Sequence, residues 1–190
     1  MGGDKIDNFE TVCLSLPTDV HRKQYMLDEF DKLKLPVWFF DACTPEDLTQ
    51  EDREFYKLCD FFDWDINQEA AMATFKSHLK ILNYSVKYNR NLLVIEDDID
   101  YVKEIDFDSI DFSKFDLYNL GIICSCYSYF VSVEGAKKII KELNSKKIYQ
   151  AFDWELAKLE TVNMIRAKEP HFIQHNKHIS NIAPNGYKRK

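Results

Sequence analysis

The order of apolar segments predicts an α/β protein built on a mixed, largely parallel sheet flanked by helices. Short aliphatic or aromatic runs alternate with longer segments in which apolar residues recur every three or four positions. Such alternation is typical of parallel strands covered by helices on both faces. The length of 190 residues suits one domain. We therefore expect a single domain over residues 1–190, with its core at about residues 11–182.

The first half of the chain predicts three strands and two long helices. Three apolar runs have the length and composition of buried strands, at residues 11–16, 37–40 and 92–95. A helix with Met26, Phe30 and Leu33 on its apolar face follows the first run, and Thr18 or Asp19 can cap it. The longest helical pattern covers residues 66–88. Between Thr44 and Asp65 the chain is charged and aromatic without a clear period, which indicates short helices and loops forming a lid or wall.

The second half predicts shorter elements. In chain order we expect an acidic loop over residues 100–115, strands over 117–124 and 126–133, helices over 134–143 and 152–159, a strand over 162–167 and an irregular tail from residue 170. No internal repeat or low-complexity linker interrupts this order. These elements complete the expected sheet.

Composition excludes several classes of function. The net charge of −7 argues against a nucleic-acid-binding surface, which needs a basic patch. The five cysteines are odd in number and form no CxxC pair, so neither a zinc site nor a disulfide framework is expected. No segment has the apolar length of a transmembrane helix or of a signal peptide core. We expect a cytoplasmic protein with reduced thiols.

Three adjacent carboxylates form the strongest functional signal. Glu96, Asp97 and Asp98 follow directly after the buried run at residues 92–95. In open α/β sheets, ligands bind at the carboxyl ends of the strands. Adjacent carboxylates repel one another, and a divalent cation such as Mn²⁺ or Mg²⁺ offsets that cost with oxygen ligands. The alternative is an ordinary strand end whose acidic residues are solvated.

Five sequence blocks together resemble glycosyltransferase family 25, which includes lipooligosaccharide and collagen galactosyltransferases. The blocks are Val12–Leu16 with Arg22 after it, Trp38–Ala42, Ser77-His78-Leu79, Leu92–Asp98 and Tyr129–Lys138. Their order and spacing carry the resemblance, since no single block is decisive. The chain departs from the family where Ser15 replaces the usual Asn, and where the stretch between Gly121 and Tyr129 is shorter than usual.

The resemblance implies a GT-A-type fold and a metal-dependent glycosyltransferase. Such an enzyme moves a hexose, galactose or glucose, from a nucleotide-diphosphate sugar, with UDP-sugar the first choice. The acceptor would be a glycan, a lipooligosaccharide or a protein, and the transfer would be inverting. Mn²⁺, or Mg²⁺, would stabilise the departing diphosphate as a Lewis acid.

The resemblance also assigns roles to individual residues. Asp98 is the candidate for direct metal contact, with Asp97 beside it and with His175 as a late ligand, although His171 and His178 remain open. The donor-site candidates are Ser15, Arg22, Asp41, Ser77, His78, Glu96 and Asp97. Arg22 could instead lie in solvent, and His78 could belong to the packed face of its helix.

An inverting transfer needs a base for the acceptor hydroxyl. Asp153 is the first candidate and Glu155 the second, although Asp153 could simply cap its helix. Two other readings remain: a catalytically inactive binding module, suggested by the short stretch after Gly121, and a phosphoryl-transfer enzyme. The latter ranks last because the chain has no glycine-rich phosphate loop.

Overall fold

The fold is a six-stranded mixed sheet between two layers, in a computed structural model that describes residues 8–56, 67–122 and 126–174. The strand order is β2-β1-β3-β6-β5-β7. The strands are β1 (Glu10–Ser15), β2 (Trp38–Asp41), β3 (Leu92–Glu96), β5 (Leu117–Asn119), β6 (Ser128–Val131) and β7 (Met164–Arg166). Only β6 runs against the other strands of this sheet. The predicted fold class, a largely parallel mixed sheet, is confirmed.

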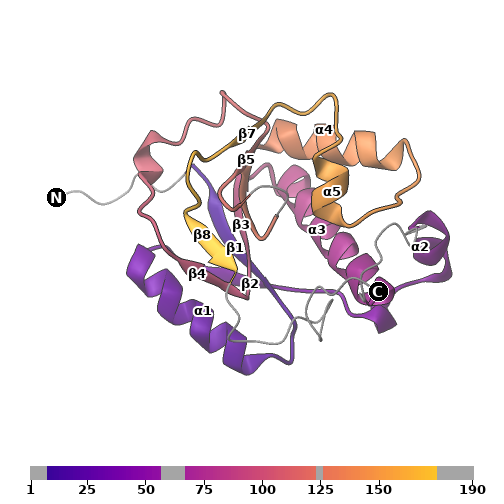
Figure 1. The fold of residues 1–190 in the computed structure, drawn as a ribbon, viewed down its shortest axis with the longest axis horizontal. Helices are drawn as coiled ribbons and strands as arrows, with labels where there is room; N and C mark the ends of the chain where they lie inside the picture. The colour runs from indigo at the N-terminus through magenta and orange to yellow at the C-terminus, as the bar shows by residue number, and fades with distance from the viewer. Residues whose placement is uncertain (1–7, 57–66, 123–125, 175–190) are drawn as a thin grey trace.

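Helices cover both faces of the sheet. The main helices are α1 (Val20–Leu33), α3 (Gln68–Tyr88), α4 (Val133–Asn144) and α5 (Phe152–Leu156). Figure 1 shows α3, α4 and α5 on one side of the sheet and α1 on the other. Apolar side chains of α3, α4 and α5 form one core with β1, β3 and β6, whereas α1 supplies Met26 and Phe30 to a second core across the sheet. Alternate residues of each strand thus serve both cores, as expected of a sheet buried on both faces.

Short helices connect β2 to α3. After Thr44 the chain forms a 3₁₀ turn, η1 (Pro45–Asp47), and then α2 (Gln50–Phe55). Both begin with a capping box in which a threonine and an aspartate bond reciprocally. This agrees with the short helices expected here, while residues 57–66 of the predicted lid lie outside the described residues.

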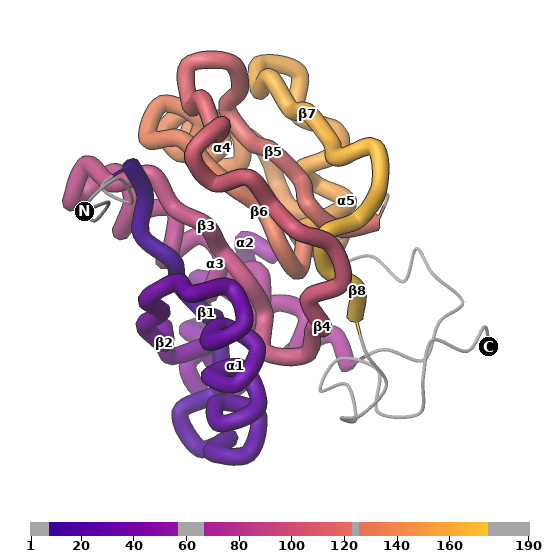
Figure 2. Tube along the Cα trace, turned by 90° about the vertical axis from the view of Figure 1, so that its left-hand side faces the viewer, coloured from indigo at the N-terminus to yellow at the C-terminus, as the bar shows by residue number. Residues whose placement is uncertain are grey.

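A second, two-stranded sheet corrects the sequence prediction. β4 (Ile99–Tyr101) and β8 (Phe172–Gln174) pair antiparallel, so the predictions of a loop from residue 100 and an irregular tail from residue 170 are wrong for these strands. Figure 2 shows the two strands side by side. Each is only three residues long, so neither shows a period, and their pairing joins segments far apart in the chain. Phe172 is 1% exposed and anchors β8 in the core beneath.

The sheet strands of the second half are shorter than predicted. β5 ends at Asn119 rather than at residue 124, and β7 covers residues 164–166 rather than 162–167. η2 (Phe107–Ser109) is a 3₁₀ turn within the expected acidic loop. Residues 123–125, part of the stretch shortened relative to the family, lie outside the described residues.

Gly135 permits α4 to dock closely on the strand region before β5. A Cβ atom built on Gly135 would lie 2.0 Å from the backbone oxygen of Asp116. The same oxygen accepts a hydrogen bond from the backbone nitrogen of Ser132, the residue that caps α4. The first turn of α4 therefore lies directly against the main chain of Asp116. This contact gives a physical reason for glycine in the block Glu134-Gly135-Ala136.

We predict that Gly135→Ala lowers the free energy of unfolding by about 2 kcal/mol, because the added methyl group must displace backbone rather than a flexible side chain. Chemical denaturation measures this change. Lys137→Ala is the matched control on the exposed face of the same helix and should alter stability by no more than about 0.5 kcal/mol. Equal stability of Gly135→Ala and the native protein would contradict the close docking of α4.

Candidate functional site

The candidate site lies where β1, β2 and β3 end. Backbone register aligns Ser15 with Asp41, and Leu14 with Glu96, so the last residues of three parallel strands meet at one edge. This edge is the usual ligand position in open α/β sheets. Register thus brings Ser15, Asp41 and Glu96, the first residue of the acidic triplet, to the same edge of the sheet.

Asp98 is held below the surface with one oxygen unpartnered. Its exposure is 9%, and its Oδ2 accepts a hydrogen bond of 2.7 Å from Nε2 of Gln174 on β8. Its Oδ1 is buried and has no hydrogen-bond partner among the described residues. Burial, together with the charges of Glu96 and Asp97, raises the pKa of Asp98 to about 7. A buried carboxylate oxygen without a partner is costly, which favours a bound ligand at this position.

Asp97 is paired with Arg22, which α1 supplies from its first turn. Nη1 of Arg22 donates a 2.7 Å hydrogen bond to Oδ1 of Asp97, and Nε of Arg22 forms an ion pair at 3.2 Å with Asp19, the cap of α1. Arg22 is 6% exposed, so its expected alternative position in solvent is wrong. Although burial disfavours the charged form, the hydrogen bond and charge of Asp97 raise the pKa of Arg22. One of the three negative charges is therefore balanced internally.

His78 supports Glu96 from α3. Nε2 of His78 lies 3.1 Å from Oε1 of Glu96, and Nδ1 lies 3.0 Å from the hydroxyl of Tyr129 on β6. The imidazole stacks on Phe152, with ring centroids 4.3 Å apart and planes at 5°. His78 is 1% exposed. It is therefore a packed residue behind the site that contacts the donor candidates only through Glu96.

Asp153 lies at the start of α5, next to the Phe152 that stacks on His78. One of its oxygens accepts a 2.9 Å hydrogen bond from the backbone nitrogen of Trp154. Burial, followed by the negative charge of Glu96, raises the pKa of Asp153 to about 6. Since Phe152 stacks on His78, which bonds Glu96, α5 begins beside the His78–Glu96 pair.

Two of the predicted site residues, Ser77 and Glu155, bond to groups that stabilise the fold. Ser77 Oγ accepts a hydrogen bond from the backbone nitrogen of Cys43 and donates one to the backbone oxygen of Ala73, both inside the core. Glu155 accepts from the backbone nitrogens of Tyr149 and Gln150 and forms an ion pair with Lys146 at 3.1 Å. With these partners, neither side chain points to a role in binding or catalysis.

Ser15 and Asp41 differ in accessibility: Ser15 is buried at 2% exposure, whereas the Asp41 side chain lies largely in solvent. The Ser15 hydroxyl donates only a long bond of 3.4 Å to the backbone oxygen of Leu16. Asp41 keeps 70% of its side chain exposed and lies 3.6 Å from Nζ of Lys23.

Of the three late histidines, His171 lies within the described residues, and its hydrogen-bond partner is a backbone oxygen rather than a carboxylate. His175 and His178 lie outside the described residues. His171 is hydrogen-bonded through Nδ1 to the backbone oxygen of Lys103 at 3.1 Å. Within residues 8–56, 67–122 and 126–174, no group of three histidine, cysteine or acidic side chains is arranged to hold a metal ion by itself.

Gln174 and Tyr129 are two site-related residues that sequence reasoning did not assign a role. Tyr129 opens one of the blocks that resemble the family, which was the available signal for it. Their contacts depend on strand pairing: β8 brings Gln174 to Asp98, and β6 brings Tyr129 to His78. A list of polar residues could not reveal either contact.

Cys13, Cys43 and Cys126 are buried and form no disulfide, while the other two cysteines lie outside the described residues. Among the helices that the structure describes, none combines the length and apolar character needed to cross a membrane.

Comparison with known proteins identifies the class as a glycosyltransferase. Residues 9–112 match the family model described as glycosyltransferase family 25 (LPS biosynthesis protein). The match covers more than half of the chain, and the chain belongs to this family. The matched segment contains Arg22, His78 and the acidic triplet, whereas Asp153 lies beyond it.

One curated relative and one solved structure are similar over most of the chain. A Haemophilus influenzae protein named "Putative glycosyltransferase" is 24% identical in an alignment 168 residues long, which covers 74% of this chain and 60% of the relative. The chain thus spans about three fifths of that relative's length. The crystal structure of a glycosyltransferase involved in the glycosylation of the major capsid of PBCV-1 is 10% identical, with a TM-score of 0.46, over 87% of this chain and 92% of that one.

We predict a pH signature for Asp153. With its pKa raised to about 6, Asp153 binds its proton more tightly in the folded protein than in the unfolded chain. Its contribution to stability is complete at low pH and is lost as the pH rises through the folded pKa. The free energy of unfolding of the native protein, minus that of Asp153→Asn, should therefore fall between about pH 4 and about pH 6 and then level off.

Chemical denaturation at a series of pH values measures this difference. Asp31→Asn, on the exposed face of α1, is the control for loss of a surface charge. A difference between the native protein and Asp153→Asn that does not change with pH would refute the raised pKa.

Proposed function

We propose that the chain is a metal-dependent glycosyltransferase that moves a hexose, galactose or glucose, from a UDP-sugar to a glycan, lipooligosaccharide or protein acceptor with inversion. The observation that carries the proposal is the unpartnered, buried Oδ1 of Asp98 at the carboxyl end of β3. Family membership supports glycosyl transfer, while the donor, the acceptor and the metal are parts of the proposal.

The residues present fit Mn²⁺ or Mg²⁺ held largely by the donor. Mg²⁺ is usually bound through one or two carboxylates together with substrate phosphates, rather than by an all-protein cage. Asp98 supplies one such carboxylate, since its Oδ1 has no protein partner. Arg22 engages one oxygen of Asp97, so the second proposed ligand has its other oxygen to offer. His175 remains a proposed third ligand. When bound, the cation would neutralise charge on the departing diphosphate.

The other residues divide the remaining work. Ser15, Asp41 and Glu96 lie at the ends of three adjacent strands, which supports the proposal that they contact polar groups of the donor. Arg22 carries a positive charge beside the position proposed for the diphosphate. Its hydrogen bond to Asp97 holds the guanidinium at that position even without a ligand.

Asp153 is the proposed base. In an inverting transfer the acceptor oxygen forms a bond to the anomeric carbon as the bond to the diphosphate breaks, and the acceptor hydroxyl loses its proton. A carboxyl group with a pKa of about 6 is mostly ionised at neutral pH and still basic enough to take that proton. Its position directly after Phe152, which stacks on the His78 that bonds Glu96, supports this role. Glu155 is no longer needed as an alternative because its oxygens are bonded elsewhere.

We predict that Mn²⁺ and UDP together raise the melting temperature of the native protein by about 5 °C or more at a hundredfold excess over the dissociation constant. Asp98→Asn should lose this shift because the neutral amide keeps the shape but removes the ligand charge. Asp31→Asn is the matched control and should keep it. Full retention of the shift in Asp98→Asn would refute the metal assignment. No shift with any common uridine or guanosine sugar would refute the proposed function.

We predict that Asp153→Asn keeps the thermal shift but loses turnover. Removal of a general base lowers the rate by about a hundredfold or more, whereas donor binding does not require it. Release of UDP from UDP-galactose or UDP-glucose, with and without acceptor, measures the rate. Glu155→Gln serves as the comparison for loss of a nearby carboxylate. Equal turnover in Asp153→Asn and the native protein would contradict the assignment. Donor binding without any turnover in the native protein would favour the inactive binding module.

A further inference from the structure

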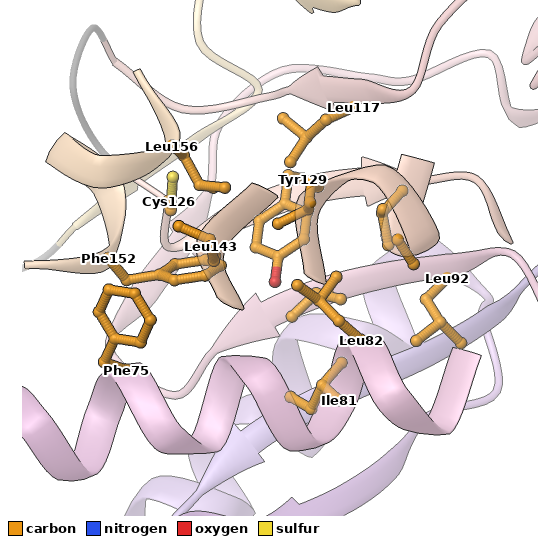
Figure 3. Packing of buried hydrophobic residues seen from close by; sticks show 14 of the residues in the cluster. Phe75, Ile81, Leu82, Leu92, Leu117, Cys126, Tyr129, Leu143, Phe152 and Leu156 are labelled. Atoms are coloured by element: carbon orange, nitrogen blue, oxygen red, sulfur yellow. The ribbon is translucent and has the colours of Figure 1, made fainter. Parts of the chain in front are cut away.

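A buried chain of hydrogen bonds lies behind the carboxylates. It runs from the hydroxyl of Tyr129, through both nitrogens of His78, to Oε1 of Glu96, with links of 3.0 and 3.1 Å. Tyr129 is completely buried and His78 almost so, whereas the Glu96 side chain is 27% exposed. The chain therefore leads from the core to the edge of the candidate site. Figure 3 shows Tyr129 among apolar side chains with its hydroxyl directed toward α3, the helix that carries His78.

The partners at the two ends determine which imidazole nitrogen carries the proton. Glu96 Oε1 is an acceptor, so the nitrogen that faces it, Nε2, must donate. The Tyr129 hydroxyl has His78 Nδ1 as its one hydrogen-bond partner among the described residues. If Nδ1 donated to this hydroxyl, the hydroxyl proton would be left without an acceptor inside an apolar core, which is costly. The arrangement that satisfies every group has Tyr129 donating to Nδ1, and Nε2–H donating to Glu96.

We propose that Tyr129 is a positioning residue for the donor site: through His78 it orients the carboxylate of Glu96 toward the ligand. The proposal deepens the proposed function and rests on it for the identity of the ligand, a nucleotide-diphosphate sugar. Glu96 Oε1 is engaged by His78, while Oε2 has no hydrogen-bond partner among the described residues. One oxygen is thereby anchored and the other is presented at the carboxyl edge of the sheet.

Packing around His78 limits the alternatives for this side chain. The imidazole lies flat against Phe152 and within 5.9 Å of the Tyr129 ring, centroid to centroid. These contacts keep the imidazole ring from flipping, so Nδ1 stays opposite Tyr129. The hydrogen bond from Tyr129 therefore determines which ring nitrogen carries the proton. Phe152 directly precedes Asp153, so the same cluster supports the two carboxylates proposed for donor binding and for proton transfer.

Nitrogen NMR of the free protein tests the positioning chain without any ligand. Two-bond ¹H–¹⁵N correlations distinguish the protonated from the unprotonated imidazole nitrogen, and His78→Gln assigns the His78 signals. We expect His78 to be neutral with its proton on Nε2. In Tyr129→Phe, which removes only the hydroxyl, the Nδ1 signal should shift as its hydrogen bond is lost. Tyr84→Phe is the matched control: it removes a half-buried hydroxyl that bonds Glu10 from the same helix, and should leave His78 unchanged. A proton on Nδ1, or no change in Tyr129→Phe, overturns the proposal.

Calorimetric titration with Mn²⁺ and UDP tests the consequence for binding. Loss of one well-placed hydrogen bond behind a charged group should weaken binding by about three- to tenfold in Tyr129→Phe. In a His78→Gln background the side-chain amide can still donate to Glu96 without help from Tyr129, so the added Tyr129→Phe change should cost less than about twofold. An equal loss in both backgrounds would mean that Tyr129 acts through packing alone and would overturn the proposal.

The two readouts separate the possible failures. If native protein binds neither Mn²⁺–UDP nor any uridine or guanosine sugar, the proposed function fails, and the NMR result still decides whether Tyr129 sets the proton position on His78. If binding is seen but His78 carries its proton on Nδ1, the positioning role of Tyr129 fails and the proposed function stands.

Discussion

Crowding of three carboxylates at the end of β3 is the constraint on which the site depends. Folding removes water from these carboxylates, and their like charges repel one another. Even the Cys13 thiol on the adjacent strand responds: burial, followed by the charges of Asp97, Asp98 and Glu96, raises its pKa well above the usual value. A protein that keeps such a cluster must compensate it from outside the strand.

Side chains from three different elements offset this repulsion, and each of them binds a different carboxylate. Arg22 from α1 neutralises Asp97, His78 from α3 anchors Glu96, and Gln174 from β8 bonds only one oxygen of Asp98. The helices and the small second sheet thus do more than cover the main sheet. Their placement decides which oxygens are satisfied by the protein and which remain for a ligand.

The acidic triplet and its strand could be predicted because they are local. Four aliphatic residues before three carboxylates identify a buried strand end whatever the rest of the chain does. Most helices could likewise be predicted from the helical spacing of their apolar residues and from their capping residues. By contrast, β4 and β8 each have three residues, and their pairing joins parts of the chain more than 70 residues apart. No local sequence pattern could therefore predict these two strands. The role of Gln174 was hidden for the same reason.

Sequence alone thus determined the fold class, the family and the position of the charged cluster. Tertiary structure decided how the candidates around that cluster differ: Ser77 and Glu155 bond to backbone groups, Arg22 is buried against Asp97, and Asp98 retains an open oxygen. The physical reason is that a hydrogen-bond partner depends on distance and direction between side chains from separate elements. Residue type and spacing along the chain specify neither, except within a single helix or strand.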